Sequence, residues 1–290
     1  MEHPIPTFAF PDFGYGIFTI YDSPFFQAVY SNFLSPMKLS NTQLKYLKSL
    51  HLRKFRQKYH NFMVEGAKMV AEVMADGQHE VEAVFATPDW AEANFPLPLH
   101  WQEKLMVVAP AELKKISTHP SPNQVLAILK QPDLTFNHQS IPNNLSLYLD
   151  DIRDPGNFGT ILRIADWFGI QWVFCSENCV ELYNPKTINA SMGAFLRVKC
   201  LAIPFTELKA ALPPDLPVCG AVLEGTSIFE TDLPIPSILI IGNESQGISS
   251  ALLPYISKKI SIPKSKAGGA ESLNAAVATG ILCAQFMMGK

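Results

Sequence analysis

The chain has 290 residues, of which 48% are hydrophobic and 17% charged, and its formal net charge is −3. That length suits two domains, each with its own core. No apolar run reaches the roughly 18 residues of a membrane span. The five cysteines lack the paired spacing of a zinc site or a disulfide framework. We therefore expect a cytoplasmic enzyme with reduced, buried thiols.

The N-terminal segment 1–37 is rich in Phe and Tyr, broken by prolines and glycines, without a steady period. It predicts a poorly packed extension. A docking arm and upstream sequence read into the protein are both open, and the regular pattern that follows Met37 favours the second.

A basic segment follows. Residues 38–60 carry no acid and seven cations, namely Lys38, Lys45, Lys48, Arg53, Lys54, Arg56 and Lys58. On an otherwise acidic chain such a stripe indicates a surface for a polyanion, and a merely solvated helix face is the equal alternative. Ser40 and Gln43 have capping-box spacing, and Leu44 and Leu47 begin a helical repeat. We expect the cations on one helix with a single buried stripe.

Residues 38–130 predict a small α/β domain. A second helix should stop at Gly77, because glycine favours the position after a helix end. A helical turn is expected at 111–116, and short strands at 81–86, 105–108 and 125–129. The polar, proline-bearing stretch 131–144 reads as a linker.

Residues 145–290 alternate strands with helices, which is typical of a mostly parallel sheet covered on both faces. The expected strands are 145–149, 172–175, 198–203, 218–223, 238–241 and 259–262. The expected helices are 157–168, with Asn157 as N-cap, then 185–195, 205–212 and 273–288. Ligands of such sheets bind at the carboxyl ends of the strands, so the loops there are the candidate binding sites.

Three loops at those ends carry polar residues. The first runs from Asp150 to Gly159 and enters the helix that holds Arg163. The second, Ile241–Gly247, has the sequence Ile-Gly-Asn-Glu-Ser-Gln-Gly and matches neither a Walker A loop nor a dinucleotide fingerprint. The third, Ile262–Asn274, leads into the last helix. Each loop alone is explained as well by turns and caps.

Together the three loops resemble the SpoU/TrmH family of the SPOUT class, which are RNA ribose 2′-O-methyltransferases. The matching segments are Asn157-Phe-Gly159 with Arg163, Gly242-Asn-Glu-Ser-Gln-Gly247, and Ile262-Pro263 with Ser272-Leu-Asn274. Lys54-Phe-Arg56 and Phe62-Met-Val-Glu-Gly66 resemble the ribosomal-protein-like substrate-binding domain of these enzymes. The resemblance implies a trefoil-knotted, parallel-sheet C-terminal domain, a homodimer with each site near the subunit interface, and S-adenosylmethionine as cofactor.

The resemblance also implies roles for single residues. The cofactor-binding residues would be Leu223, Gly242, Asn243, Ile262 and Leu273. The catalytic residues would be Asn157, Arg163, Glu244, Ser272 and Asn274. The RNA-binding residues would be Lys45, Lys48, Arg53, Lys54, Arg56 and Lys58. No metal is expected, since the sulfonium already activates the methyl group.

Arg163 is the residue whose chemical role stays open. A guanidinium gives up its proton with great difficulty, so we favour Arg163 as a holder of the RNA phosphate and polariser of the hydroxyl over Arg163 as a general base. Two features depart from the pattern of the family. Residues 264–271 are more polar and richer in glycine than the usual link between the strand and the last helix. The acids Asp150, Asp151 and Asp154 lie beside the site, where they would repel RNA unless they face away.

The sequence therefore predicts a 2′-O-methyltransferase acting on 23S ribosomal RNA. A transfer RNA methyltransferase of the same fold and a non-catalytic RNA-binding protein remain the alternatives. A small-molecule enzyme that binds phosphate through the glycine loops is disfavoured by the missing fingerprints.

Overall fold

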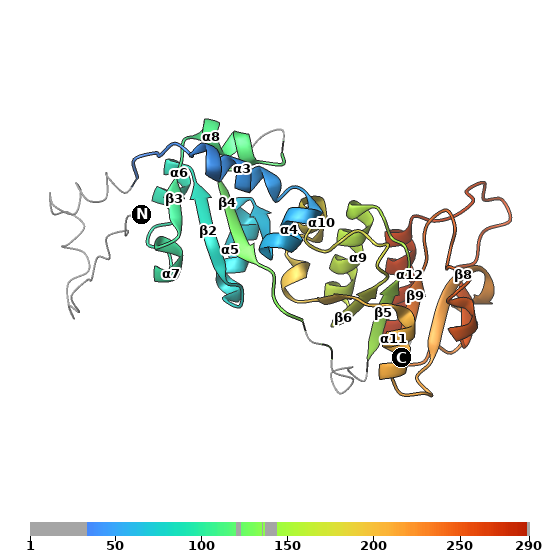
Figure 1. Ribbon diagram of the computed structural model, residues 1–290. Helices are drawn as coiled ribbons and strands as arrows, with labels where there is room; N and C mark the ends of the chain where they lie inside the picture. The colour runs from blue at the N-terminus through green and yellow to red at the C-terminus, as the bar shows by residue number, and fades with distance from the viewer. Residues whose placement is uncertain (1–33, 120–122, 135, 137–143, 289–290) are drawn as a thin grey trace, which may run out of the picture.

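The computed structural model describes residues 34–119, 123–134, 136 and 144–288. Two β-sheets organise the chain and lie side by side, as Figure 1 shows. The expected extension over 1–37 falls almost wholly outside the described residues, and so does most of the expected linker. No helix of the described part has the length and apolar character to cross a membrane.

The N-terminal sheet has four strands in the order β1-β4-β2-β3. Strand β4 is antiparallel to both neighbours, while β2 and β3 are parallel. The strands are β1 (Asn61–Glu65), β2 (Val81–Ala86), β3 (Leu105–Val107) and β4 (Val125–Lys130). The helices are α3 (Asn41–Ser49), α4 (Arg53–Tyr59), α5 (Ala67–Asp76), α6 (Pro88–Ala93), α7 (Leu99–Gln102) and α8 (Pro110–Ile116).

The basic segment forms two helices, so the expected single helix is wrong. The capping box of Ser40 and Gln43 is present at the start of α3. The helix stops after Ser49, and α4 begins at Arg53 after the extended residue Leu52. The expected stop at Gly77 is confirmed, because Gly77 follows α5 with a left-handed backbone, φ 63°.

The C-terminal sheet has six strands that are all parallel, as the strand and helix alternation predicts. The order of the strands is β10-β8-β9-β5-β6-β7. The strands are β5 (Leu145–Leu149), β6 (Trp172–Cys175), β7 (Lys199–Ala202), β8 (Val218–Ser227), β9 (Ser237–Ile241) and β10 (Lys258–Ser261). The helices are α9 (Pro155–Trp167), α10 (Pro185–Ser191), α11 (Phe205–Ala211) and α12 (Ala275–Met288), with the 3₁₀ turns η2 (Ala194–Leu196) and η3 (Leu253–Tyr255).

Alternate residues of the central strands pack into different cores, since successive side chains of a strand point to opposite faces. In β5, Leu147 joins the core under α9, α10 and α12, while Tyr148 joins the core under α11. Helices α9 and α10 approach so closely that a Cβ on Gly159 would lie 2.6 Å from the Ala190 Cβ. Only glycine fits there, which explains the glycine early in α9.

The two halves of the chain are packed against each other through one hydrophobic cluster. Phe62 of β1 contacts Tyr183, with ring centroids 4.5 Å apart, and Phe195 of η2, with centroids 5.9 Å apart. At the edge of this interface Arg197 reaches both Asp166 of α9 and Glu72 of α5. The N-terminal half is therefore held in one position over α9 and α10.

Candidate active site

The three polar loops meet at the carboxyl edge of the parallel sheet, as the sequence predicts. Strands β5 and β9 are paired neighbours that end at Leu149 and Ile241. The loop after β5 leads into α9, and the loop after β9 contains residues 242–247. The third loop joins β10 to α12. Because parallel strands end on the same side, these segments from distant parts of the sequence lie together.

Glu244 joins the three loops through one carboxylate oxygen. Its Oε1 accepts hydrogen bonds from Asn157 Nδ2 at 2.5 Å and from Asn274 Nδ2 at 2.9 Å. The backbone N–H of Ala275 donates to the same oxygen at 3.1 Å. Asn274 Nδ2 also donates to Asn157 Oδ1 at 2.9 Å. Three of the five residues expected to be catalytic are thus in direct contact.

The expected role of Asn157 as N-cap of α9 is wrong. Asp154 is the N-cap, and its Oδ1 accepts from the Asn157 backbone N–H at 2.7 Å. Pro155 follows as the first helical residue, a position that suits proline because its missing N–H is not needed there. The Asp-Pro pair therefore starts the helix two residues earlier and leaves the Asn157 side chain free to reach Glu244.

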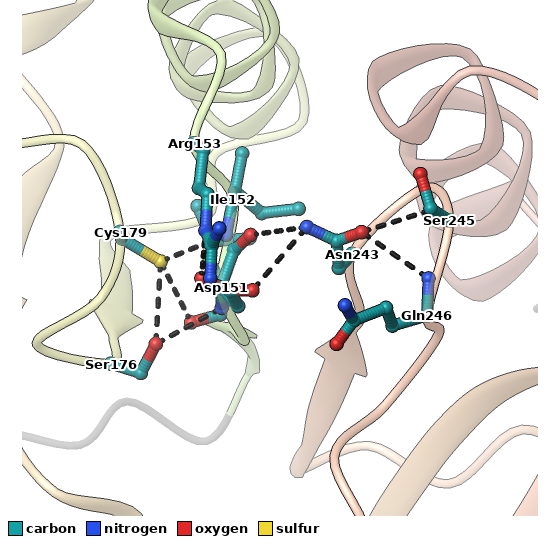
Figure 2. Close-up of polar contacts among 9 residues, drawn as sticks. Asp151, Ile152, Arg153, Ser176, Cys179, Asn243, Ser245 and Gln246 are labelled. Carbon is teal, nitrogen blue, oxygen red and sulfur yellow. Dashed lines mark hydrogen bonds and ion pairs between the residues drawn. The ribbon is translucent and has the colours of Figure 1, made fainter.

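The second loop is a tight turn closed on itself. Asn243 N–H donates to Gly247 O at 3.0 Å and Gly247 N–H donates to Asn243 O at 2.9 Å. A Cβ on Gly242 would lie 2.3 Å from the Gly247 carbonyl carbon, so the crossing of the two ends needs glycine there. Asn243 Oδ1 accepts from the N–H of Ser245 at 2.9 Å and from that of Gln246 at 3.3 Å, which holds the turn from inside (Figure 2).

The acids of the first loop hold this turn in place, which sequence reasoning missed. Asn243 Nδ2 donates to the Asp151 carbonyl at 2.9 Å and to its Oδ2 at 3.4 Å (Figure 2). The buried Asp150 accepts from Ser249 N–H at 2.7 Å. The acids that would repel RNA are therefore engaged with protein donors. The signal for this was their position directly after a buried strand, where caps and turns need acceptors.

Asp151 itself is supported from below by the loop after β6. Its N–H donates to Ser176 Oγ at 3.0 Å, and the next N–H, of Ile152, donates to Cys179 Sγ at 3.2 Å (Figure 2). Asp151 has a left-handed backbone, φ 59°, which Asp tolerates better than most residues. The hydrogen bond with the neighbouring Cys175, and then burial, raise the pKa of Cys179, so its thiol stays protonated and donates to Leu149 O.

Arg163 and Ser272 stand apart from the Glu244 contacts. Arg163 is exposed on α9, six residues beyond Asn157, and Ser272 is exposed before α12. Among the described residues no hydrogen bond joins Arg163 to Glu244 or to Ser272. The structure thus brings Asn157, Glu244 and Asn274 together and leaves the other two expected catalytic residues on the surface beside them.

The residues expected to bind the cofactor include exposed aliphatic side chains. Leu223 is 78% exposed and Leu273 is 45% exposed, whereas Ile262 is half-buried. The pairing of β8 with β10 jumps from Gly220 to Thr226, so Leu223 lies in an irregular segment that has no partner on β10. The side chain of Asn243, in contrast, forms hydrogen bonds within the turn and with Asp151.

The expected RNA-binding residues divide into two groups. Lys45, Lys48, Lys54 and Lys58 are exposed on α3 and α4. Arg56 is only 2% exposed, which overturns its expected role: its Nη1 donates to Leu50 O and its Nε and Nη2 to Glu181 Oε1. The Arg53 side chain is 54% exposed, and its Nε lies 3.7 Å from Glu181 Oε2. Arg56 thus serves the contact between the two halves of the chain.

Comparisons with known proteins agree with this geometry. The SpoU rRNA methylase family model matches residues 144–284, and an MRM3-like substrate-binding domain model matches residues 41–127. A tRNA/rRNA methyltransferase of Synechocystis, named as uncharacterized, is 30% identical over 87% of this chain and 93% of its own length. The 23S rRNA (guanosine(2553)-2′-O)-methyltransferase of Bacillus subtilis is 28% identical over 83% of this chain and 94% of its own.

A solved structure described as an RNA methyltransferase of the TrmH family from Porphyromonas gingivalis superposes with a TM-score of 0.76. It is 33% identical and covers 88% of this chain and 100% of its own. The fold and the site define an RNA methyltransferase of the SPOUT class. The chain belongs to the SpoU rRNA methylase family.

Proposed function

We propose that the protein transfers the methyl group of S-adenosylmethionine to a ribose 2′-hydroxyl of ribosomal RNA. The observation that carries this proposal is the contact of Asn157, Glu244 and Asn274, which assembles one polar site from three loops at the carboxyl edge of the sheet. The Bacillus subtilis relative supports the choice of ribosomal RNA, and 23S ribosomal RNA is the first molecule to test.

The residues present fit an adenosine-bearing cofactor. Leu223 and Leu273 offer exposed aliphatic side chains to a flat ring, and Ile262 adds a half-buried one. The Gly242–Gly247 turn offers backbone at close approach, because neither glycine has a side chain to hold a ligand away. When bound, S-adenosylmethionine supplies a methyl group activated by the positive sulfonium. Asn243 shapes the turn and takes no direct part in binding the cofactor.

The chain's own residues have to orient the weak nucleophile. Arg163 holds an RNA phosphate beside the site through its planar fork of donors and polarises the 2′-hydroxyl. Asn157 and Asn274 present amide groups whose orientation Glu244 fixes. The hydroxyl proton passes to water or to a neighbouring group. An Arg163→Lys variant with near-wild-type turnover would contradict this role, since lysine keeps the charge but not the fork.

Residues 38–130 select the RNA and residues 145–290 carry out the transfer. The exposed lysines of α3 and α4 attract the phosphate backbone. Arg53 contributes through the part of its guanidinium that faces solvent.

A homodimer completes the proposal. Helices α9 and α12 pack on each other, and they leave Trp167, one turn beyond Arg163 on α9, 83% exposed and Val277 of α12 52% exposed. A second copy would cover this face and bring its Ser272 to Arg163. A trefoil knot in the last segment and a cytoplasmic location belong to the proposal as well, and five buried free thiols suit a reducing compartment.

The test is incubation of the protein with methyl-labelled S-adenosylmethionine and with ribosomal or transfer RNA from a strain that lacks it. We expect label on a ribose of ribosomal RNA, located by fragment mass. Label only on transfer RNA would overturn the substrate, and label on a base would overturn the reaction. Cofactor binding without any transfer would support a non-catalytic RNA-binding protein instead.

A further inference from the structure

Three aromatic side chains line the junction of α3 and α4. Phe55 and Tyr59 lie one turn apart on α4, with ring centroids 6.2 Å apart and planes inclined by 15°. Tyr46 of α3 meets Tyr59 edge-on at 5.1 Å. Asn61 Nδ2 donates to the Tyr46 hydroxyl at 2.6 Å and fixes that ring. We call Tyr46, Phe55 and Tyr59 the aromatic strip.

The strip is open to solvent on one side. Tyr59 is 37% exposed and Phe55 is half-buried. Tyr46 packs against the cluster that contains Leu47 and Leu50, whereas Phe55 and Tyr59 pack into none of the three hydrophobic clusters formed by the described residues. A ring that serves only to fill a core would be enclosed by such a cluster. Core packing therefore explains the position of Tyr46 but leaves part of the Phe55 and Tyr59 rings open to a ligand.

Two lysines place their ammonium groups over rings of the strip. Lys54 Nζ lies 5.9 Å from the Phe55 ring centroid, and Lys58 Nζ lies 5.4 Å from the Tyr59 centroid. Residues four apart share a helix face, so α4 carries a row of cations parallel to a row of rings. The acid that acts electrostatically on Tyr46 is Glu82, and its Oε2 is paired with Lys130 Nζ at 3.4 Å.

A row of lysines beside a row of aromatic rings fits one kind of polyanion. In an RNA duplex the bases are stacked on each other, and a protein meets mainly phosphates and hydroxyls. An unpaired strand offers base faces beside its phosphates, and single-strand-binding proteins combine aromatic platforms with cations. We propose that the aromatic strip is a stacking platform for an unpaired segment of the substrate RNA, with Lys54 and Lys58 on the adjoining phosphates.

The inference rests on the proposed function for its ligand, and the full-length protein tests it. The probe is a short unstructured RNA oligonucleotide carrying 2-aminopurine, compared with an RNA duplex of the same length. Tyr59→Leu removes the ring, and Tyr59→Phe keeps it. Lys58→Ala removes a cation of the strip, and Lys104→Ala removes an exposed lysine elsewhere in the same half. Circular dichroism and Tm verify that each variant is folded.

We expect Tyr59→Leu to weaken oligonucleotide binding on the order of tenfold and to abolish quenching of 2-aminopurine, while Tyr59→Phe stays near wild type. The salt dependence should be unchanged in Tyr59→Leu. In Lys58→Ala the logarithmic salt slope should fall by about 0.7, the value for one phosphate of a single strand, and Lys104→Ala should leave it unchanged.

Two results would overturn the stacking platform while leaving the enzyme intact. One is equal binding by Tyr59→Leu and wild type, and the other is equal affinity of wild type for duplex and oligonucleotide, each in a protein that methylates ribosomal RNA. A wild-type protein that binds neither RNA and transfers no methyl group would overturn the proposed function together with this inference.

Discussion

Removing the carboxylate of Glu181 should destabilise the contact between the two halves of the chain. Arg56 is 2% exposed, and its guanidinium donates to Glu181 and to the Leu50 carbonyl. Burial, with a smaller effect of the Arg53 charge, lowers the pKa of Arg56 to about 10, so at neutral pH the side chain remains charged. Glu181→Ala therefore leaves a buried cation without its counter-ion.

The size of the effect follows from this burial. Removing one partner of a buried ion pair costs about 3–5 kcal/mol, because the other charge stays desolvated. Leu50 O continues to accept from Nη1, and the Glu181 side chain is 15% exposed, so water can reach its place. We expect the low end, about 3 kcal/mol, which is a large part of the 5–15 kcal/mol typical of natural proteins.

Urea unfolding followed by tryptophan fluorescence measures the loss in free energy of unfolding, and it reports on both halves of the chain. Trp90 and Trp101 lie in the N-terminal half, and Trp167 and Trp172 lie in the C-terminal half. We expect a lower unfolding midpoint in Glu181→Ala and a separation of the transitions of the two halves. Glu177→Ala is the matched control, since this exposed glutamate lies in the same loop.

A second variant separates the charge from the packing. The double substitution Arg56→Met with Glu181→Met should recover much of the loss, because apolar residues of similar volume can replace a buried pair. A Glu181→Ala protein within about 0.5 kcal/mol of wild type, the usual range for neutral surface changes, would refute the reasoning.

Three further results are expected. Glu244→Ala should lower kcat/KM by about 10-fold or more, because charge-assisted hydrogen bonds from two side-chain amides and one backbone N–H are lost, whereas Ser245→Ala should not lower it. Equal kcat/KM for Glu244→Ala and wild type would refute the role of Glu244 in joining the three loops. Gly159→Ala should destabilise by about 1–3 kcal/mol in thermal unfolding because of overpacking, and Gly269→Ala, in open space, should be neutral. Burial raises the pKa of Cys219 to about 11 and that of Cys283 to about 12. The thiols of the unfolded chain therefore lose their protons at lower pH than those of the folded protein, and the stability should fall as the pH rises from about 9 to 11. Rapid thiol labelling of the native protein at pH 8 would contradict the burial.

The order of elements in the C-terminal half was predictable because its apolar runs are short and bounded. Strands β5 and β6 lie at the predicted residues, and α12 begins two residues later than expected. Ends fixed by a cap were harder to place. Asn157 and Asp154 are both good N-caps in isolation, and the proline after Asp154 was the signal that decided between them.

The sequence identified the residues of the site but not the contacts between them. The loop residues Asn157, Glu244 and Asn274 were singled out as candidates, yet no pattern in the sequence states that one oxygen of Glu244 contacts both of the other loops. Asp150 and Asp151 were expected to repel RNA unless they faced away from it. Their engagement with Ser249 and Asn243 depends on two strands that are neighbours in the sheet and about 90 residues apart in the chain.

The sequence by itself determined the alternation of strands and helices, the three polar loops and the excess of cations over residues 38–60, because these are properties of neighbouring residues. The tertiary structure alone decided which of those cations face solvent. Lys54 and Arg56 are two positions apart on α4, and α4 presents only one face to the other half of the chain. Lys54 therefore remains at the surface beside the aromatic strip, while Arg56 is buried against Glu181, since a helix turns its side chain by about 100° at every residue.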